Sequence, residues 1–371
     1  MAYVYMPIMA PKKGEFTALG HLSQSVQGRT LPLFELGGRK PGVNQIEKSI
    51  ARTAQAAGKV WSGRRALLDA SKWRPNDRTE NRIHVLEYAF DQFQKNGIEL
   101  VPVVGYDRWD DPSYRSAVEN IVEKSRLMPC IRIDRESLND EIRDVEHFGG
   151  RIRGILDHLE LAANECLILL DFESVSSLSV PDFIALADVG ISTCRALGFS
   201  RIAIAGGSMP ATVDAAVQSH DSEGCIPRVE MMGWRAVVSR GASDILLADY
   251  VIRCPSAVEG IISRHANAKI RYTIKNQFFI LRGHSKDWES LERQHKVLAE
   301  KLISSHHCAG PQFSWGDSQV MGCALGNRPI RDATTMISVD SNHHIVSIMD
   351  EILEHRRTVT MPGGLVLSAR E

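Results

Sequence analysis

The stretch CLILLDFE at residues 166–173 decides the fold of this chain. Five apolar residues run without a break from Cys166 to Leu170, and the carboxylates Asp171 and Glu173 follow at once. A continuous apolar run of this length is typical of a strand buried on both faces. The two carboxylates would then lie at the C-terminal rim of a parallel sheet, where α/β folds place their functional groups.

The same pattern, an apolar run with a polar end and a helix after it, recurs along the chain. Strands are expected at residues 3–9, 30–36, 65–70, 99–105, 129–134, 166–173, 201–206 and 244–252. Strands that alternate with helices predict parallel pairing with right-handed crossovers. We therefore expect an α/β fold, a TIM-like (β/α)₈ barrel. An open doubly wound sheet is the alternative, but no strand is followed by the GxGxxG motif that marks it.

The C-terminal part is less regular. The run IRYTIKNQFFIL at residues 270–281 predicts a hairpin, and one of its halves could replace residues 244–252 as the eighth barrel strand. Other expected elements are short strands at 319–325 and 334–339, helices at 43–61, 288–305 and 345–355, a helix at 140–163 broken at its Gly-Gly pair, and a loose tail from residue 358. The barrel is assigned to residues 1–285. A helical or mixed extension, packed on the barrel within one structural domain, is assigned to residues 286–371.

Composition narrows the classes of function. The 371 residues are 43% hydrophobic and 24% charged, with a formal net charge of -1. This balance gives no reason to expect direct nucleic-acid binding, and no apolar run reaches the roughly 18 residues that span a membrane. The seven cysteines include no CxxC pair, which is typical of reduced thiols in a cytoplasmic protein.

Several stretches resemble a known family in order and spacing. They are YMPIMAPKKGEFTAL at residues 5–19, PLFEL at 32–36, PRVEMMGW at 227–234, ADYVI at 248–252, IRYTI at 270–274, FFILRG at 278–283, FSWGDSQV at 313–320 and HHIV at 343–346. The chain resembles the beta protein family of satellite phages, prophages and bacteria. Family members often carry a glycine where this chain has Val251.

The resemblance implies a biological setting rather than a reaction. The family is linked to mobile elements and anti-phage defence, where its members accompany a toxic or effector partner. A partner protein from the same defence operon is therefore expected.

Carboxylates at predicted strand ends are the first candidates for a site. They are Glu35, Asp69, Asp171, Glu173 and Asp249. In a barrel they would converge on one mouth, where Asp69, Asp171 and Glu173 could hold Mg²⁺ or Mn²⁺. Alternatively, two of Asp171, Glu173 and Asp249 could divide the acid and base roles of catalysis. Each carboxylate could instead cap a helix or pair with an arginine.

Further candidates are basic or hydroxyl-bearing. Arg132, Arg271 and Arg282 at the same mouth would bind a phosphate or carboxylate, such as that of a nucleotide-like ligand. Gly207 and Ser208 follow the seventh strand, where many barrels bind phosphate, and Tyr250 would add a hydroxyl. The alternative for the arginines is ion pairing within the barrel, and the alternative for Gly207 and Ser208 is a turn that binds no ligand.

Two functions follow from these patterns. One is an interaction protein that binds and controls a partner in a phage-encoded or anti-phage system. The other is a divalent-metal-dependent hydrolase or phosphodiesterase at the barrel mouth. Strand alternation also predicts that Asp171 and Glu173 share one side while Phe172 packs outward. The changes Asp171→Asn and Glu173→Gln are expected to leave folding nearly intact and to abolish binding at the mouth.

Overall fold

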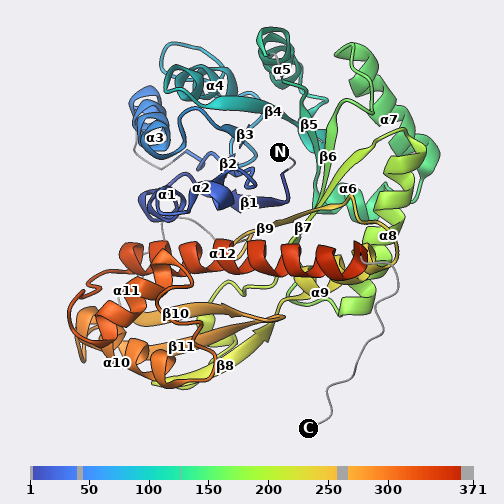
Figure 1. The fold of residues 1–371 in the computed structure, drawn as a ribbon. Coiled ribbons are helices and arrows are strands. Elements are labelled where there is room, and N and C mark those ends of the chain that lie inside the picture. Colours follow the sequence, from blue (N-terminus) through green and yellow to red (C-terminus); the bar gives the residue numbers. More distant parts are fainter. Residues whose placement is uncertain (1–2, 40–44, 126, 257–265, 361–371) are drawn as a thin grey trace.

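Eight parallel strands close into a barrel in the computed structural model, which describes residues 3–39, 45–125, 127–256 and 266–360 (Figure 1). The barrel strands are β1 (Tyr5–Met9), β2 (Leu33–Glu35), β3 (Arg65–Asp69), β4 (Glu99–Gly105), β5 (Cys130–Ile133), β6 (Leu167–Ser174), β7 (Arg201–Gly207) and β9 (Leu246–Asp249). The expected TIM-like barrel is confirmed.

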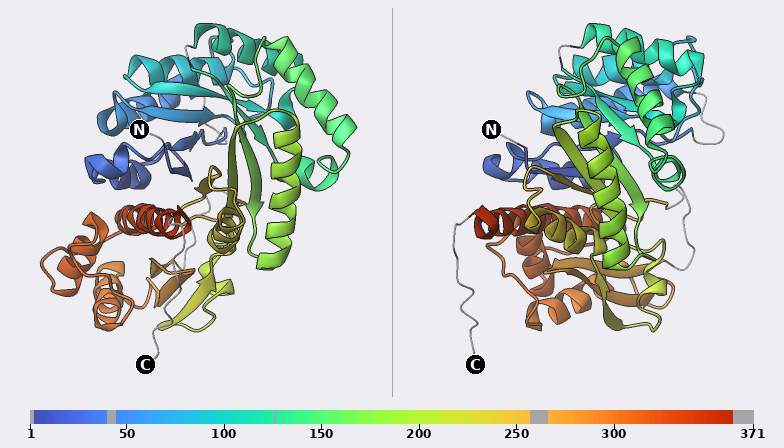
Figure 2. Two further views of the ribbon diagram at one scale, coloured as in Figure 1. Left: turned by 45° about the vertical axis from the view of Figure 1, so that its right-hand side comes forward. Right: turned by 90° about the vertical axis from the view of Figure 1, so that its right-hand side faces the viewer.

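Helices surround the barrel, as the turned views in Figure 2 show. They are α1 (Lys13–Gly20), α2 (Gln24–Gln27), α3 (Ile46–Trp61), α4 (Val85–Lys95), α5 (Pro112–Lys124), α6 (Arg135–Asp140), α7 (Val145–His158), α8 (Val180–Ala196) and α9 (Val229–Ser239).

Among the described helices, none is long and apolar enough to cross a membrane. All seven cysteines are free thiols.

Side-chain alternation divides each strand between two cores. One core fills the barrel and includes Met6, Leu67, Leu169 and Ala248, while the neighbouring residues in each strand join the core under the helices. In β6 the ring of Phe172 packs outward on Phe183 of α8, with centroids 5.2 Å apart. The outward packing expected for Phe172 is therefore confirmed.

The eighth barrel strand is β9, which pairs with both β7 and β1, so the alternative that used the hairpin is wrong. The hairpin forms β10 (Asn267–Ile274) and β11 (Gln277–Ser285) of a second sheet. Its third strand, β8 (Ser222–Pro227), comes from the connection between β7 and α9 and pairs with β11. Sequence patterns did not predict β8, because its residues are only half-buried or exposed and form no apolar run.

A long helix joins the barrel to the second sheet. Helix α12 (Ala333–Thr360) contacts β1, α1 and α9 on the barrel side and β10 on the other (Figure 1). Helices α10 (Leu291–Ser304) and α11 (Trp315–Ala324) pack with the second sheet around a separate apolar core.

Three expectations for local structure were wrong. The expected strands at 319–325 and 334–339 are wrong, because residues 319–324 and 334–339 are helical. Helix α11 is capped by Ser314, whose hydroxyl accepts from the Asp317 N–H, and packing against the second core outweighs the strand propensity of the β-branched residues. Residues 140–163 contain a helix boundary before Val145 rather than a break at Gly149, where a Cβ would lie 3.1 Å from a Leu197 methyl group. Residues 43–44 and the tail beyond residue 360 lie outside the described residues.

Candidate functional site

The C-terminal mouth of the barrel is centred on the guanidinium of Arg132, which points inward from β5. Arg132 donates to Asp171 Oδ2 at 2.5 and 2.9 Å, to Asp69 Oδ2 at 2.7 Å and to Glu35 Oε1 at 2.9 Å. It also donates to the Tyr250 hydroxyl, which in turn donates to Asp171 at 2.7 Å. The expected convergence is therefore observed for these five residues, all of which are buried.

A second arginine completes the pairing of Asp69. Arg108, in the turn after β4, donates to Asp69 Oδ1 at 2.9 Å and to Asp107 at 3.2 Å. Its guanidinium lies against Gly105, where a Cβ would overlap it, and over the ring of Tyr114. The glycine at the end of β4 thus makes room for this buried cation.

Glu35 lies between three cations. Besides Arg132, Lys72 and Arg253 lie 3.7 and 3.6 Å from Glu35 Oε2. The named groups of the mouth balance in charge: four cations (Lys72, Arg108, Arg132, Arg253) face four carboxylates (Glu35, Asp69, Asp107, Asp171). The mouth is therefore neutralised internally.

The pKa values reflect this pairing. Burial would raise the pKa of Glu35, but Arg132, Arg253 and Lys72 outweigh burial and lower it below its usual 4.5. Burial would likewise raise the pKa of Asp69, but Arg108 and Arg132 outweigh burial and lower it below its usual 3.8. Burial and the nearby Asp171 raise the pKa of Tyr250 well above 10. These carboxylates are held ionised by their cations, and the tyrosine is held neutral.

Asp249 does not join the mouth, so the expectation for this carboxylate was wrong. Its neighbours Ala248 and Tyr250 point into the barrel, and Asp249 therefore points outward. It accepts from the Tyr5 hydroxyl at 2.5 Å and lies 3.0 Å from His344 Nε2 on α12. Because Asp249 can only accept, that nitrogen carries the proton, and His344 Nδ1 accepts from Thr273 at 2.8 Å.

Glu173 lies at the rim but not in the ion network. It lies within an irregularity in the pairing of β6, between Asp171 and Ser174, and has a positive φ of 50°. Its N–H donates to Asp171 at 2.9 Å, while burial and the charge of Asp171 raise the pKa of its own carboxyl. Asp171 is fully buried, and Asp171→Asn would weaken the hydrogen bonds that it accepts from Arg132 and Tyr250. The expectation that this change leaves folding nearly intact is therefore not supported.

Arg271 and Arg282 lie on the second sheet, so the expectation that they share the barrel mouth was wrong. Arg271 of β10 lies 3.6 Å from Asp340 of α12. Arg282 of β11 donates to the carbonyl of Val217 at 2.7 Å. Arg271 therefore links the second sheet to α12, and Arg282 links it to the segment before β8.

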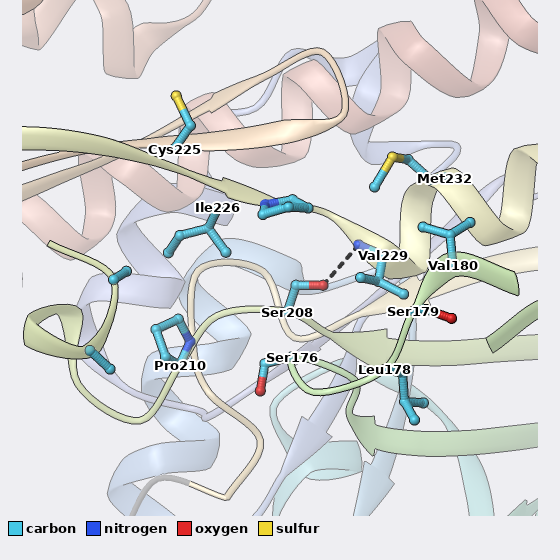
Figure 3. Close-up of a pocket in the computed structure, with 13 residues that line it drawn as sticks. Ser176, Leu178, Ser179, Val180, Ser208, Pro210, Cys225, Ile226, Val229 and Met232 are labelled. Carbon is cyan, nitrogen blue, oxygen red and sulfur yellow. Dashed lines mark hydrogen bonds between the residues drawn. The ribbon is translucent and has the colours of Figure 1, made fainter. Parts of the chain in front are cut away.

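Gly207 is the last residue of β7, and Ser208 after it lines a pocket of about 530 Å³ (Figure 3). The Ser208 hydroxyl donates to Glu230 and accepts from the Val229 N–H at 2.9 Å, and burial raises the pKa of Glu230 to about 7. The pocket walls carry no charged side chain; they are formed by Ser176, Leu178, Ser179, Val180, Ser208, Pro210, Ala215, Ala216, Cys225, Ile226, Pro227, Val229 and Met232. These walls do not favour a phosphate ligand.

The predicted metal site is not supported by the donor arrangement. Asp69 and Asp171 direct their oxygens at Arg132, so a guanidinium occupies the position where they would share a cation. Within the described residues, no group of three or more His, Cys, Asp or Glu side chains is placed to hold a metal ion.

Sequence reasoning missed Arg108, Lys72 and Arg253 as parts of the mouth. Each follows a barrel strand (β4, β3 and β9), so a search for cations within a few residues of strand ends would have found all three.

Comparisons with known proteins give one family finding. A family model described as "Beta protein" matches residues 5–350, which includes the barrel, the second sheet and most of α12. A search of curated proteins finds no match.

Proposed function

Because the chain belongs to the Beta protein family over residues 5–350, we propose that it is a component of a phage-encoded or anti-phage defence system. Its task is to bind and control a partner protein, a toxin or an effector. The barrel is the scaffold that presents the binding surface. The family resemblance supports the setting, and the barrel mouth supports the role as a scaffold.

The closed ion network carries the proposal. A catalytic carboxylate needs a free lone pair for a proton or a metal ion. Asp69 and Asp171 instead hold Arg132 in place and are fully buried. In this barrel the position that usually serves chemistry links β3, β5 and β6 to one another.

The alternative, a divalent-metal-dependent hydrolase or phosphodiesterase, is less well supported. It requires Arg132 to leave the centre of the mouth. Three carboxylates would then remain in a buried site without their shared cation. Removing one partner from a buried ion pair costs about 3–5 kcal/mol. A phosphate-bearing ligand would need to offset this cost before any reaction began.

A pull-down tests the proposal. The tagged chain is expressed in cells that carry its native neighbouring genes, purified at low salt, and analysed by mass spectrometry. We expect a neighbouring gene product to co-purify. We also expect that product to be toxic when expressed alone and less toxic when co-expressed with this chain. Recovery of no neighbouring product, or metal-dependent phosphodiesterase activity of the pure chain, would overturn the proposal.

A further inference from the structure

A groove of about 510 Å³ lies between α1 and α3 on the outside of the barrel. Its lining comprises Pro11, Lys13, Phe16, Thr17, Gly20, His21, Arg52, Thr53, Ala56, Lys59 and Val60. The two helices are neighbours (Figure 1), but α1 has 8 residues and α3 has 16, so α1 covers only part of the face of α3. Gly20 at the end of α1 adds no side chain, and the apolar surface of Ala56 and Val60 stays partly exposed.

The rim of the groove is basic. Lys13, Arg52 and Lys59 are exposed there, and no acidic residue is part of the lining. Lys13 lies near Asp332, whose lowered pKa comes first from a backbone hydrogen bond of Thr335 and in smaller part from this lysine. Among the described residues, Arg52 and Lys59 form no ion pair. Two unpaired cations thus flank an apolar floor.

The groove continues toward the barrel mouth. A second hollow of about 120 Å³ shares Pro11 and Thr53 with the first and adds the basic residues Lys12 and Arg39, and none of the described residues that line it is acidic. Along α3 the two linings extend from Ile46 to Val60. At 1.5 Å per residue this is about 21 Å, the length of roughly four turns of a helix.

We propose that this groove is the docking site for an acidic amphipathic helix of the partner protein. This inference rests on the partner-binding function proposed above and names the partner's chemistry. The apolar face of the helix lies on Phe16, Ala56 and Val60, and its acidic side chains face Arg52 and Lys59. Recognition of a helix in a groove uses apolar anchors three or four residues apart, and the opposite charges select the partner and its orientation.

A nucleic acid fits the same surface less well. A nucleic-acid backbone binds to a continuous row of basic residues that contact successive phosphates. The free energy of such binding comes mainly from electrostatic interactions. Here the basic residues lie at the edges, and the floor between them is apolar. Burial of that floor stabilises a complex with an apolar helix face but not with phosphates.

The experiment compares charge reversals in the pull-down. Arg52→Glu/Lys59→Glu is the groove variant, and Lys95→Glu/Arg153→Glu is the control with the same change in net charge. Lys95, like Lys59, lies in the last turn of its helix, and Arg153, like Arg52, lies within a helix; all four side chains are exposed. Ala56→Tyr is a third variant that fills the groove without changing charge. Circular dichroism and thermal melting verify that each variant is folded.

We expect the groove variant and Ala56→Tyr to bind the partner about tenfold more weakly or worse, while the control binds like the wild type. Replacing acidic residues of the partner helix by lysine should restore binding to the groove variant. If the wild type recovers a partner and both groove changes leave binding intact, the docking site is wrong and the partner-binding function stands. If nuclease treatment removes the bound partner, the groove binds nucleic acid instead. If the wild type recovers no partner, both proposals fail.

Discussion

At the scale of single residues, Arg132 is the centre of the barrel mouth. We expect Arg132→Met to lower the free energy of unfolding by about 3–5 kcal/mol, because it leaves Glu35, Asp69 and Asp171 buried without their shared cation. Urea denaturation measures the change. Arg153→Met is the control, since Arg153 is exposed, and it should change stability by less than about 0.5 kcal/mol. Equal effects of the two changes would show that the network contributes little.

The same network predicts that the free energy of unfolding depends on pH. The pKa values of Glu35 and Asp69 are lower in the folded chain than their usual 4.5 and 3.8, so their contribution to stability is complete above these values. It is lost as the pH falls through the folded-state pKa values. The stability gap between wild type and Arg132→Met should therefore narrow below about pH 4, because protonated carboxyls no longer need the guanidinium. A gap that stays constant down to pH 3 would contradict this assignment.

Val251 is strained. Its φ of 59° is in the left-handed region, which a β-branched residue rarely adopts, and it stands where the family resemblance implies a glycine. Relief of about 1–3 kcal/mol of strain should offset most of the burial lost in Val251→Gly. Val104→Gly in β4, also buried but with no positive φ, should cost about 3 kcal/mol. Thermal melting compares the two; a Val251→Gly chain as unstable as Val104→Gly would argue against strain.

At the scale of elements, α12 connects the two sheets through adjacent histidines. His344 contacts Asp249 at the end of β9 and the Thr273 hydroxyl of β10. His343 lies 2.8 Å from Asp317 of α11 and 2.8 Å from the Thr273 carbonyl. Both histidines therefore bond to Thr273 of the second sheet, but only His344 also reaches the barrel, through Asp249.

We expect His344→Ala to destabilise the chain by about 1–3 kcal/mol, because it removes a donor from the buried Asp249 carboxylate. His355→Ala on the same helix is the matched control, since that side chain is only half-buried and bonds a backbone carbonyl. Chemical denaturation at pH 7 measures both. A larger effect at position 355 would overturn the role of His344.

The sequence predicted the register of β6 because the apolar Phe172 lies between the carboxylates Asp171 and Glu173. The side chains of Asp171 and Phe172 point as expected. The stretch around β9 is apolar on both faces, so alternation could not decide whether Asp249 or Tyr250 points inward. Arg108 folds back over Gly105 from a turn, a direction that residue spacing does not encode.

At the scale of the whole molecule, the missed features depend on pairing between distant segments. Arg271 and Arg282 belong to a sheet that combines a strand before β9 with two strands after it. No local pattern in residues 222–227 indicates that they form strand β8 and pair with β11. The barrel could therefore be predicted from repeated local units, whereas the second sheet could not.

A chain that ends at residue 285 tests how far the barrel is independent. It keeps all eight barrel strands but lacks α10, α11 and α12, so it exposes the second core and leaves Asp249 without His344. We expect it to aggregate or to lack a cooperative melting transition, while the full chain unfolds in a single transition. Calorimetry of both chains measures this. A truncated chain with a sharp transition would indicate an autonomous barrel.

The insertion of β8 ahead of the last barrel strand also affects the order in which the nascent chain can fold. Strand β8 ends at Pro227, but its partner β11 begins at Gln277. At 5–20 residues per second, the ribosome needs about 3–10 s to synthesise the intervening segment. During that time the hydrogen-bonding edge of β8 has no partner, because β11 has not yet been synthesised. Unpaired strand edges pair readily with other chains. Strong overexpression, which crowds many unfinished chains together, should therefore lower the soluble yield more than slow expression does.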